Sequence, residues 1–296
     1  MYKSISELIS SAANKKRSIA DLMLEQECLY SKQTRENVLD RLKGQLRVMR
    51  QAAQKGSSSP GVVSKTGLTG QDAVKLVKYQ KTGQSLVGAT VLKAMVNALA
   101  TNEVNASMGV VCSAPTAGSA GTIPGVLFAL EKKLSLTPKQ ELDFLLCASG
   151  FGLIIANNAM IAGAMGGCQA EVGSASAMAA AAAVAVKGGS PKQSADAFAF
   201  ALSNLLGLVC DPVAGLVELP CVNRNVVGTV NALATADMAL AGMTSKIPAD
   251  EVVTALKDVG QRMPRELRET GLGGLAATPT GMKIKMKIFG KDVSTQ

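Results

Sequence analysis

The chain has 296 residues, 47% of them apolar, which is enough material for a sizeable core and argues against overall disorder. It contains no histidine, so it cannot by itself build a Ser-His-Asp triad, a Cys-His pair or a His-containing zinc site. Its net charge of +9 is concentrated towards the two ends, and aromatics make up only 3%. Few side chains could stack on bases, so we expect no nucleic-acid partner.

The N-terminal segment lacks the pattern of a secretory signal. Glu7 comes before any apolar run, and Lys15, Lys16 and Arg17 follow Ile9 rather than precede it. We therefore expect a cytoplasmic protein. In that compartment the six cysteines stay reduced, so thiolates that bind a metal are favoured over disulfides.

The first third of the chain is predicted to be helical with one interruption. Residues 1–55 are charged, and between Leu39 and Met49 an apolar residue recurs at every third or fourth position, which predicts one apolar helix face. Residues 55–70 are rich in Gly and Ser and mark a loop or a boundary. Residues 71–111 return to helical spacing.

Residues 112–280 are dominated by Ala, Gly, Ser and Met. Residues 144–170 and 172–186 carry no charge, and runs of roughly 18 apolar residues raise the possibility of a membrane span. Asn157, Asn158 and the predominance of alanine in the second run argue against a span. We predict instead an all-α fold, in which the whole chain forms a single, densely packed helical domain rich in Ala and Gly, with no membrane contact.

Two helix starts and the C-terminal end have distinct patterns. Thr137 and Ser190 each precede a proline and stand three residues before Gln140 and Gln193, the reciprocal capping arrangement at a helix N-terminus. Residues 283–296 form a short basic tail without a clear period.

Three cysteines lie beside glycine, proline or acidic residues, in contexts typical of loops: Cys168, Cys210 and Cys221. Their spacing matches neither a zinc ribbon nor a ferredoxin run, so spacing alone does not establish a metal site. Cys147 lies in an apolar run and is interpreted as a buried small hydrophobe.

The segment 113–125 is rich in Gly, Ser and Thr and leads into an apolar helix expected from Val126 to about Leu134. Such a loop can direct backbone N–H groups and hydroxyls towards an anion. It lacks the lysine of a P-loop, so a small carboxylate is the better ligand, and a simple turn between two helices is the alternative. The candidate binding residues are Ser113, Thr116, Gly118, Ser119 and Gly121.

Further polar residues are candidates for the same site. Asn158 could bind substrate. Arg224 follows Cys221 and could either offset thiolate charge or contact substrate. The charges of residues 265–270 are interpreted as a solvated or paired helix face.

Five segments in order form a recognisable pattern: NEVNASMG at 102–109, APTAGS at 114–119, GCQAEVG at 167–173, CDPV at 210–213 and GLAATPTG at 274–281. Together they resemble the alpha subunit of the iron-sulfur-dependent bacterial L-serine dehydratases that are built from separate alpha and beta chains. The similarity spans nearly the whole chain.

The resemblance implies a mostly helical catalytic chain that holds a [4Fe-4S] cluster on loop-borne Cys168, Cys210 and Cys221. It implies deamination of L-serine to pyruvate and ammonia without pyridoxal phosphate. It also implies a beta subunit as partner, whose part of the family pattern includes a histidine motif absent from this chain, and a higher oligomer.

Glu171, three residues after Cys168, is the candidate base within this chain, and a residue of the beta chain is the alternative. Met160 and Ala162 stand where the family is expected to have small hydroxylated residues. A related lyase that acts on L-cysteine or L-threonine is therefore a second hypothesis. A non-catalytic scaffold that binds a cluster or senses redox state is a third.

Overall fold

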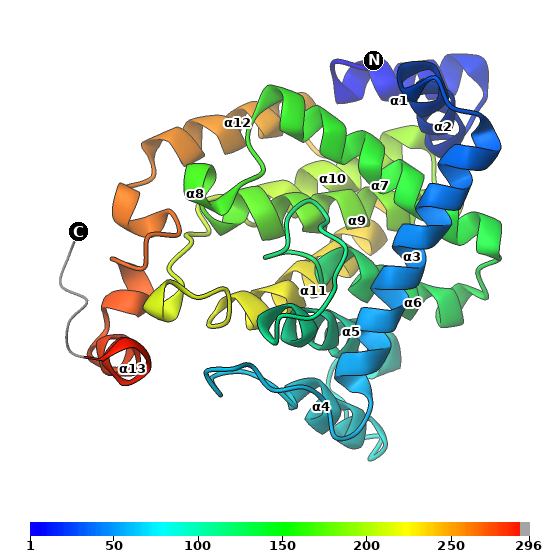
Figure 1. Ribbon diagram of the computed structural model, residues 1–296. Coiled ribbons are helices and arrows are strands. Elements are labelled where there is room, and N and C mark those ends of the chain that lie inside the picture. The colour runs from blue at the N-terminus through cyan, green and yellow to red at the C-terminus, as the bar shows by residue number, and fades with distance from the viewer. Residues whose placement is uncertain (291–296) are drawn as a thin grey trace.

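The protein is built from helices joined by mostly short connections (Figure 1). The computed structural model describes residues 1–290, and in that part the all-α prediction is confirmed, with thirteen α-helices and no β-strand. The α-helices are α1 (Ile5–Lys15), α2 (Ile19–Ser31), α3 (Arg35–Ser57), α4 (Asp72–Gln80), α5 (Gly88–Ala106), α6 (Thr122–Leu134), α7 (Pro138–Asn158), α8 (Gly163–Gly166), α9 (Ser174–Val186), α10 (Pro191–Ser203), α11 (Cys221–Leu240), α12 (Ala249–Arg262) and α13 (Pro279–Phe289). The shorter segments are the π-helix η1 (Gln169–Gly173) and the 3₁₀ turns η2 (Val213–Gly215), η3 (Arg265–Leu267) and η4 (Gly274–Ala277).

The alanine-rich α9 is the central helix, and α6, α7, α10 and α11 pack around it (Figure 1). Every residue from Ser174 to Val184 is buried. The stretch Gln169–Val186 is long and apolar enough to cross a membrane, but 89% of it is buried inside the protein. The prediction of a core helix rather than a membrane span agrees with this burial, because a helix that is apolar all round is covered by its neighbours.

Small residues allow close approach where helices cross. At Gly56 the long helix α3 passes over α5, and a Cβ atom at this position would lie 2.2 Å from the carbonyl oxygen of Ala100. Any larger residue there would force the two helices apart.

Both predicted reciprocal caps form. The Thr137 hydroxyl accepts a hydrogen bond from the Gln140 backbone at 3.3 Å, and the Gln140 side chain accepts one from the Thr137 backbone at 2.9 Å. Ser190 and Gln193 repeat the arrangement at 3.2 and 2.9 Å. These caps begin α7 and α10 at the predicted residues.

The helical spacing predicted for residues 71–111 corresponds to two helices, because the chain turns after Gln80, the last residue of α4, and Gly83 in this turn adopts a φ of +72°. One predicted helix start differs from that in the structure. The helix expected from Val126 begins four residues earlier, at Thr122, because Pro124 fits in a first helical turn, where backbone N–H groups need no partner.

The predicted basic tail also contains more structure than expected. Residues 283–289 belong to α13, which starts at Pro279 with the Thr278 hydroxyl accepting from the Gly281 backbone at 3.1 Å. The remaining part of that predicted tail, 291–296, lies outside the described residues.

Connections that are far apart in sequence meet at one end of the bundle. Cys210, in the segment after α10, forms an isolated parallel bridge with Arg268 in the segment after α12. Gly118, in the loop between α5 and α6, packs against the carboxylate of Glu171 in η1. The candidate site lies where these segments converge.

Candidate metal and substrate site

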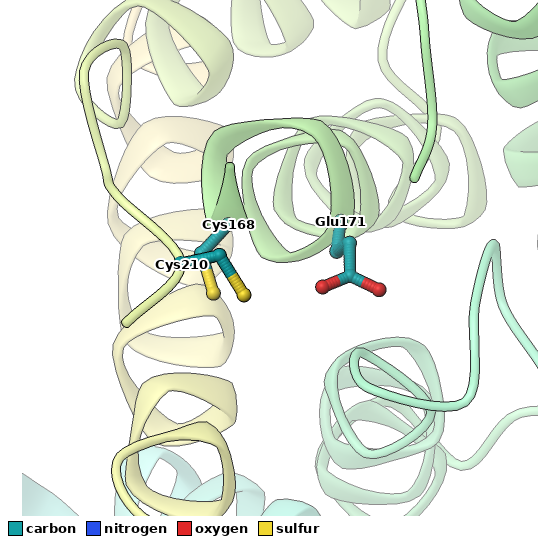
Figure 2. A group of neighbouring side chains, drawn as sticks. All are labelled: Cys168, Glu171 and Cys210. Carbon is teal, nitrogen blue, oxygen red and sulfur yellow. The ribbon is translucent and has the colours of Figure 1, made fainter. Parts of the chain in front are cut away.

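Two thiols and one carboxylate form a buried group. The ligand atoms of Cys168, Cys210 and Glu171 all lie within 4.8 Å of one another (Figure 2). Cys168 and Cys210 are each 2% exposed and Glu171 is 8% exposed. Figure 2 shows the two sulfur atoms and the carboxylate pointing in the same direction. This donor set could hold a metal.

Local backbone structure explains how these side chains meet. Cys168 immediately precedes the π-helix η1, which carries Glu171 three residues later on the same face. Single-turn π segments occur frequently at functional sites. Cys210 is in extended backbone, where its N–H donates to Leu267 O at 2.8 Å and its carbonyl accepts from Glu269 N–H at 2.7 Å.

Cys221, the third predicted ligand, is the first residue of α11 and is 5% exposed. Burial raises the pKa of its thiol, and the neighbouring charges of Cys168 and Glu171 raise it further. The structure therefore brings Cys221 near the buried group, although the three atoms that lie within 4.8 Å belong to the other residues. Cys168 and Cys221 stand at helix starts, and Cys210 lies on a loop.

The other cysteines have different surroundings. Burial raises the pKa of Cys147 to about 12, in agreement with its interpretation as a core side chain. Cys28 and Cys112 are half-buried, and all six cysteines are free of disulfides.

Arg224 adds a positive charge beside the thiols. Its guanidinium lies 3.6 Å from Cys168 Sγ, donates to Val209 O at 2.7 Å and pairs with Asp211 at 2.8 Å. A hydrogen bond with Cys210 and the charge of Arg224 lower the pKa of the Cys168 thiol, against the opposing effect of burial. Arg224 is therefore placed to stabilise a thiolate on Cys168.

Glu171 is held by the glycine-rich loop. The Thr116 hydroxyl donates to Glu171 Oε1 at 2.5 Å. Burial raises the pKa of Glu171, the hydrogen bond from Thr116 opposes this effect, and the nearby Glu269 carboxylate adds to it. Both carboxylates lie beside Gly163, where a Cβ atom would be 2.6 Å from Glu171 and 3.2 Å from Glu269.

The predicted binding loop is packed rather than open. Ser119 is fully buried, and its hydroxyl lies within hydrogen-bond distance of Ala114 O and of Thr116. The carbonyl of Gly118 accepts from Asn102 at 2.9 Å and from Asn225 at 2.8 Å.

Two other residues of this loop have different positions. Gly121 is buried against Ala98 O, whereas Ser113 is exposed. Of the five predicted loop residues, Thr116 and Gly118 therefore reach Glu171.

Asn158 is not brought into this group. It lies at the end of α7, where its amide donates to Lys3 O at 3.0 Å and to Ile154 O at 2.8 Å. Met160 is buried and faces Gly166 and Gly260. Met160 therefore helps to pack α8 against α12.

A cavity of about 660 Å³ opens beside Glu171. Its walls include Thr116, Gly118 and three charged residues that sequence reasoning did not place in the site, Lys65, Glu218 and Glu269. Glu218 and Glu269 each lie close in sequence to a segment already singled out, but Lys65 lies in a stretch interpreted only as a loop.

Comparison with known proteins identifies the family. Residues 14–276 match the family described as the serine dehydratase alpha chain. The chain belongs to this family. All candidate site residues from Lys65 to Glu269 lie inside the matched range of the serine dehydratase alpha chain.

Several relatives in this family cover the chain almost completely. A probable L-serine dehydratase alpha chain of Bacillus subtilis is 56% identical over 98% of this chain and 96% of its own length. An L-serine dehydratase alpha chain of Peptoniphilus asaccharolyticus is 44% identical, with 96% and 97% coverage. An L-serine dehydratase of Streptomyces coelicolor is 36% identical over 93% of this chain, which covers only 60% of that longer protein.

Proposed function

We propose that this chain is the catalytic alpha chain of an L-serine dehydratase that converts L-serine to pyruvate and ammonia with a [4Fe-4S] cluster. The observation that carries the proposal is the buried group of Cys168, Cys210 and Glu171 beside a cavity large enough for an amino acid. The names of the relatives in the same family support the substrate.

The donor set fits an iron-sulfur cluster. Cys168, Cys210 and Cys221 are buried and free, and thiolates are the ligands that such clusters use. Arg224 offsets part of the negative charge that several thiolates concentrate in one place. A bound cluster with three cysteine ligands would supply one iron as a Lewis acid towards the substrate hydroxyl.

Glu171 is the proposed proton acceptor within the chain. It lines the cavity, and Thr116 orients its carboxylate through Oε1. Among the described residues no hydrogen bond is made to Oε2, so this atom is available to take the Cα proton. Loss of the proton and of the hydroxyl group as hydroxide, together one water, gives aminoacrylate, which tautomerises to an imine and is hydrolysed to pyruvate and ammonium.

We also propose a beta chain as partner and a cytoplasmic location. The Streptomyces relative, named simply L-serine dehydratase, has additional length that this chain does not cover. The family name "alpha chain" is consistent with a second subunit that supplies this missing part.

Anaerobic reconstitution tests the proposed function. After incubation with iron and sulfide we expect about four of each per chain, and with the beta chain present we expect pyruvate from L-serine. L-threonine and L-cysteine are assayed in parallel by the keto acid that each forms. Faster turnover of either than of L-serine would favour a related lyase. Cluster binding without any turnover would favour the scaffold hypothesis.

A further inference from the structure

The cavity beside Glu171 has an uneven charge distribution. Among the described residues that line it, Lys65 is the only cation, whereas Glu171, Glu218 and Glu269 are acidic. A free α-amino acid has one carboxylate and one ammonium group. Each needs an opposite charge in a site that is partly closed to water.

The backbone around Lys65 is fixed although its side chain is exposed. Thr66 and Thr69 donate to the Glu218 carboxylate at 2.8 and 2.9 Å. Ser64 N–H donates to Thr69 O at 2.9 Å and closes the same turn. Both carboxylate oxygens of Glu218 therefore accept hydrogen bonds from this turn, which holds the Lys65 backbone at the cavity wall. The Lys65 side chain makes no hydrogen bond to a described residue.

Three candidates named from the sequence are already occupied or fully buried, and Arg265 and Arg268 line a neighbouring cavity that shares Gly215 and Glu269 with this one. The hydroxyl of Thr116 donates to Glu171, so a carboxylate placed there would meet like charge. Ser119 is fully buried. Arg224 is bound to Asp211, Val209 and Cys168.

Glu269 is placed to receive the ammonium group. Its backbone N–H donates to Cys210 O, which fixes the residue next to the thiols, and it lines the same cavity as Lys65. Its carboxylate lies beside that of Glu171 across Gly163, and two converging carboxylates attract a cation.

We infer that Lys65 binds the carboxylate of the amino-acid substrate and that Glu269 binds its ammonium group. This inference rests on the proposed function. It says that two residues outside the cysteine and Glu171 group recognise the charged groups that all free α-amino acids share. A charge-assisted hydrogen bond of this kind is worth roughly 10- to 100-fold in affinity.

Steady-state kinetics of the enzyme, reconstituted anaerobically with its beta chain, test the assignment together with binding of L-alanine. L-alanine carries both charged groups and lacks the leaving hydroxyl, so its affinity, measured by calorimetry, does not depend on turnover. Lys65→Ala should raise the KM for L-serine and the Kd for L-alanine by about 10- to 100-fold, with a smaller change in kcat. Lys65→Arg should recover part of the loss, and Glu269→Gln should weaken L-alanine binding.

Lys78→Ala, at an exposed lysine on α4 that lines no described cavity, is the matched control and should match wild type. Unchanged KM and Kd in Lys65→Ala would overturn the inference. So would a lower kcat at unchanged KM, because that result marks a proton-transfer group. Wild-type protein that binds L-alanine but forms no pyruvate from L-serine would contradict the proposed function, while the comparison of Kd values would still decide the role of Lys65.

Discussion

Cys168, Cys210 and Cys221 differ from the other three cysteines in what surrounds their sulfur atoms. They lie near one another and near Arg224 and Glu171, so each thiol responds to the charge of its neighbours. Cys147 is surrounded by apolar core instead. Metal binding requires thiolates. The charge of Arg224 favours the thiolate form of Cys168 and of Cys221, whereas burial and the neighbouring negative charges raise the pKa of Cys210 and Cys221.

Replacing Cys168, Cys210 or Cys221 by Ser should therefore abolish cluster binding. A hydroxyl is a poor iron ligand, and in the Cys168 variant Arg224 would also lose its sulfur partner. Iron and sulfide counted after anaerobic reconstitution provide the measurement. Cys28→Ser, at a half-buried position with no such neighbours, should retain the cluster. Equal iron content in all four variants would show that the ligand assignment is wrong.

Short sequence motifs allowed some of the individual site residues to be predicted. Cys168 and Glu171 share one segment, and two residues three positions apart on one helical face meet without help from the rest of the fold. Lys65 and Glu269 could not be found in this way, because their approach depends on Glu218 and on the Cys210 bridge. The burial of Ser119 was also missed, since a serine in a glycine-rich loop has the same pattern whether it faces solvent or core.

Among the elements, α4 depends on a carboxylate from another helix for its N-terminal cap. Gln71, which precedes the helix, has a φ of +64° and provides no side-chain cap. Glu103 of α5 instead accepts from the N–H groups of Asp72 at 2.7 Å and Ala73 at 3.3 Å. Burial raises the pKa of Glu103 to about 7, against the effect of these two donors.

This cap makes stability depend on pH. The folded protein holds a proton on Glu103 between pH 4.5, its ordinary pKa, and about 7, whereas the unfolded chain does not. The free energy of unfolding should therefore fall as pH rises through that window and level off above it, by about 1–3 kcal/mol from this residue. Urea unfolding at several pH values measures the effect.

Glu103→Gln keeps an oxygen acceptor for α4 and cannot ionise, so the contribution of the Gln side chain to stability should not vary with pH. Because wild type loses stability as pH rises, the free energy of unfolding of the variant should rise relative to that of wild type between pH 5 and 8. Glu103→Ala should be less stable at every pH, because the N-terminus of α4 loses its acceptor. Parallel pH profiles for wild type and Glu103→Gln would show that the group does not titrate in this window.

The elements themselves were predictable where their signals are local. The caps at Thr137 and Ser190 begin α7 and α10 as expected, because the bonded groups are three residues apart. The start of α4 could not be predicted from its own sequence, because the residue that caps it, Glu103, belongs to α5.

For the whole molecule, the absence of histidine gives a prediction about assembly. If the beta chain supplies a further proton-transfer residue beside Glu171, the isolated alpha chain should bind a cluster yet turn over L-serine slowly. Addition of purified beta chain should raise kcat by about 10²-fold or more, the usual contribution of a general acid or base. Full activity of the alpha chain alone, with its cluster intact, would place the whole proton transfer on residues such as Glu171.

The alanine-rich centre of the bundle has a consequence for how the sequence tolerates change. A helix with one exposed face can accept many substitutions on that face, but α9 has neighbours on every side from Ser174 to Val184. An added methylene there has no empty space to enter and no route to solvent. In a library of random variants selected for folded protein, the buried run 166–184, which contains η1 and most of α9, should be the longest stretch depleted of substitutions, although most side chains of α9 are a single methyl group.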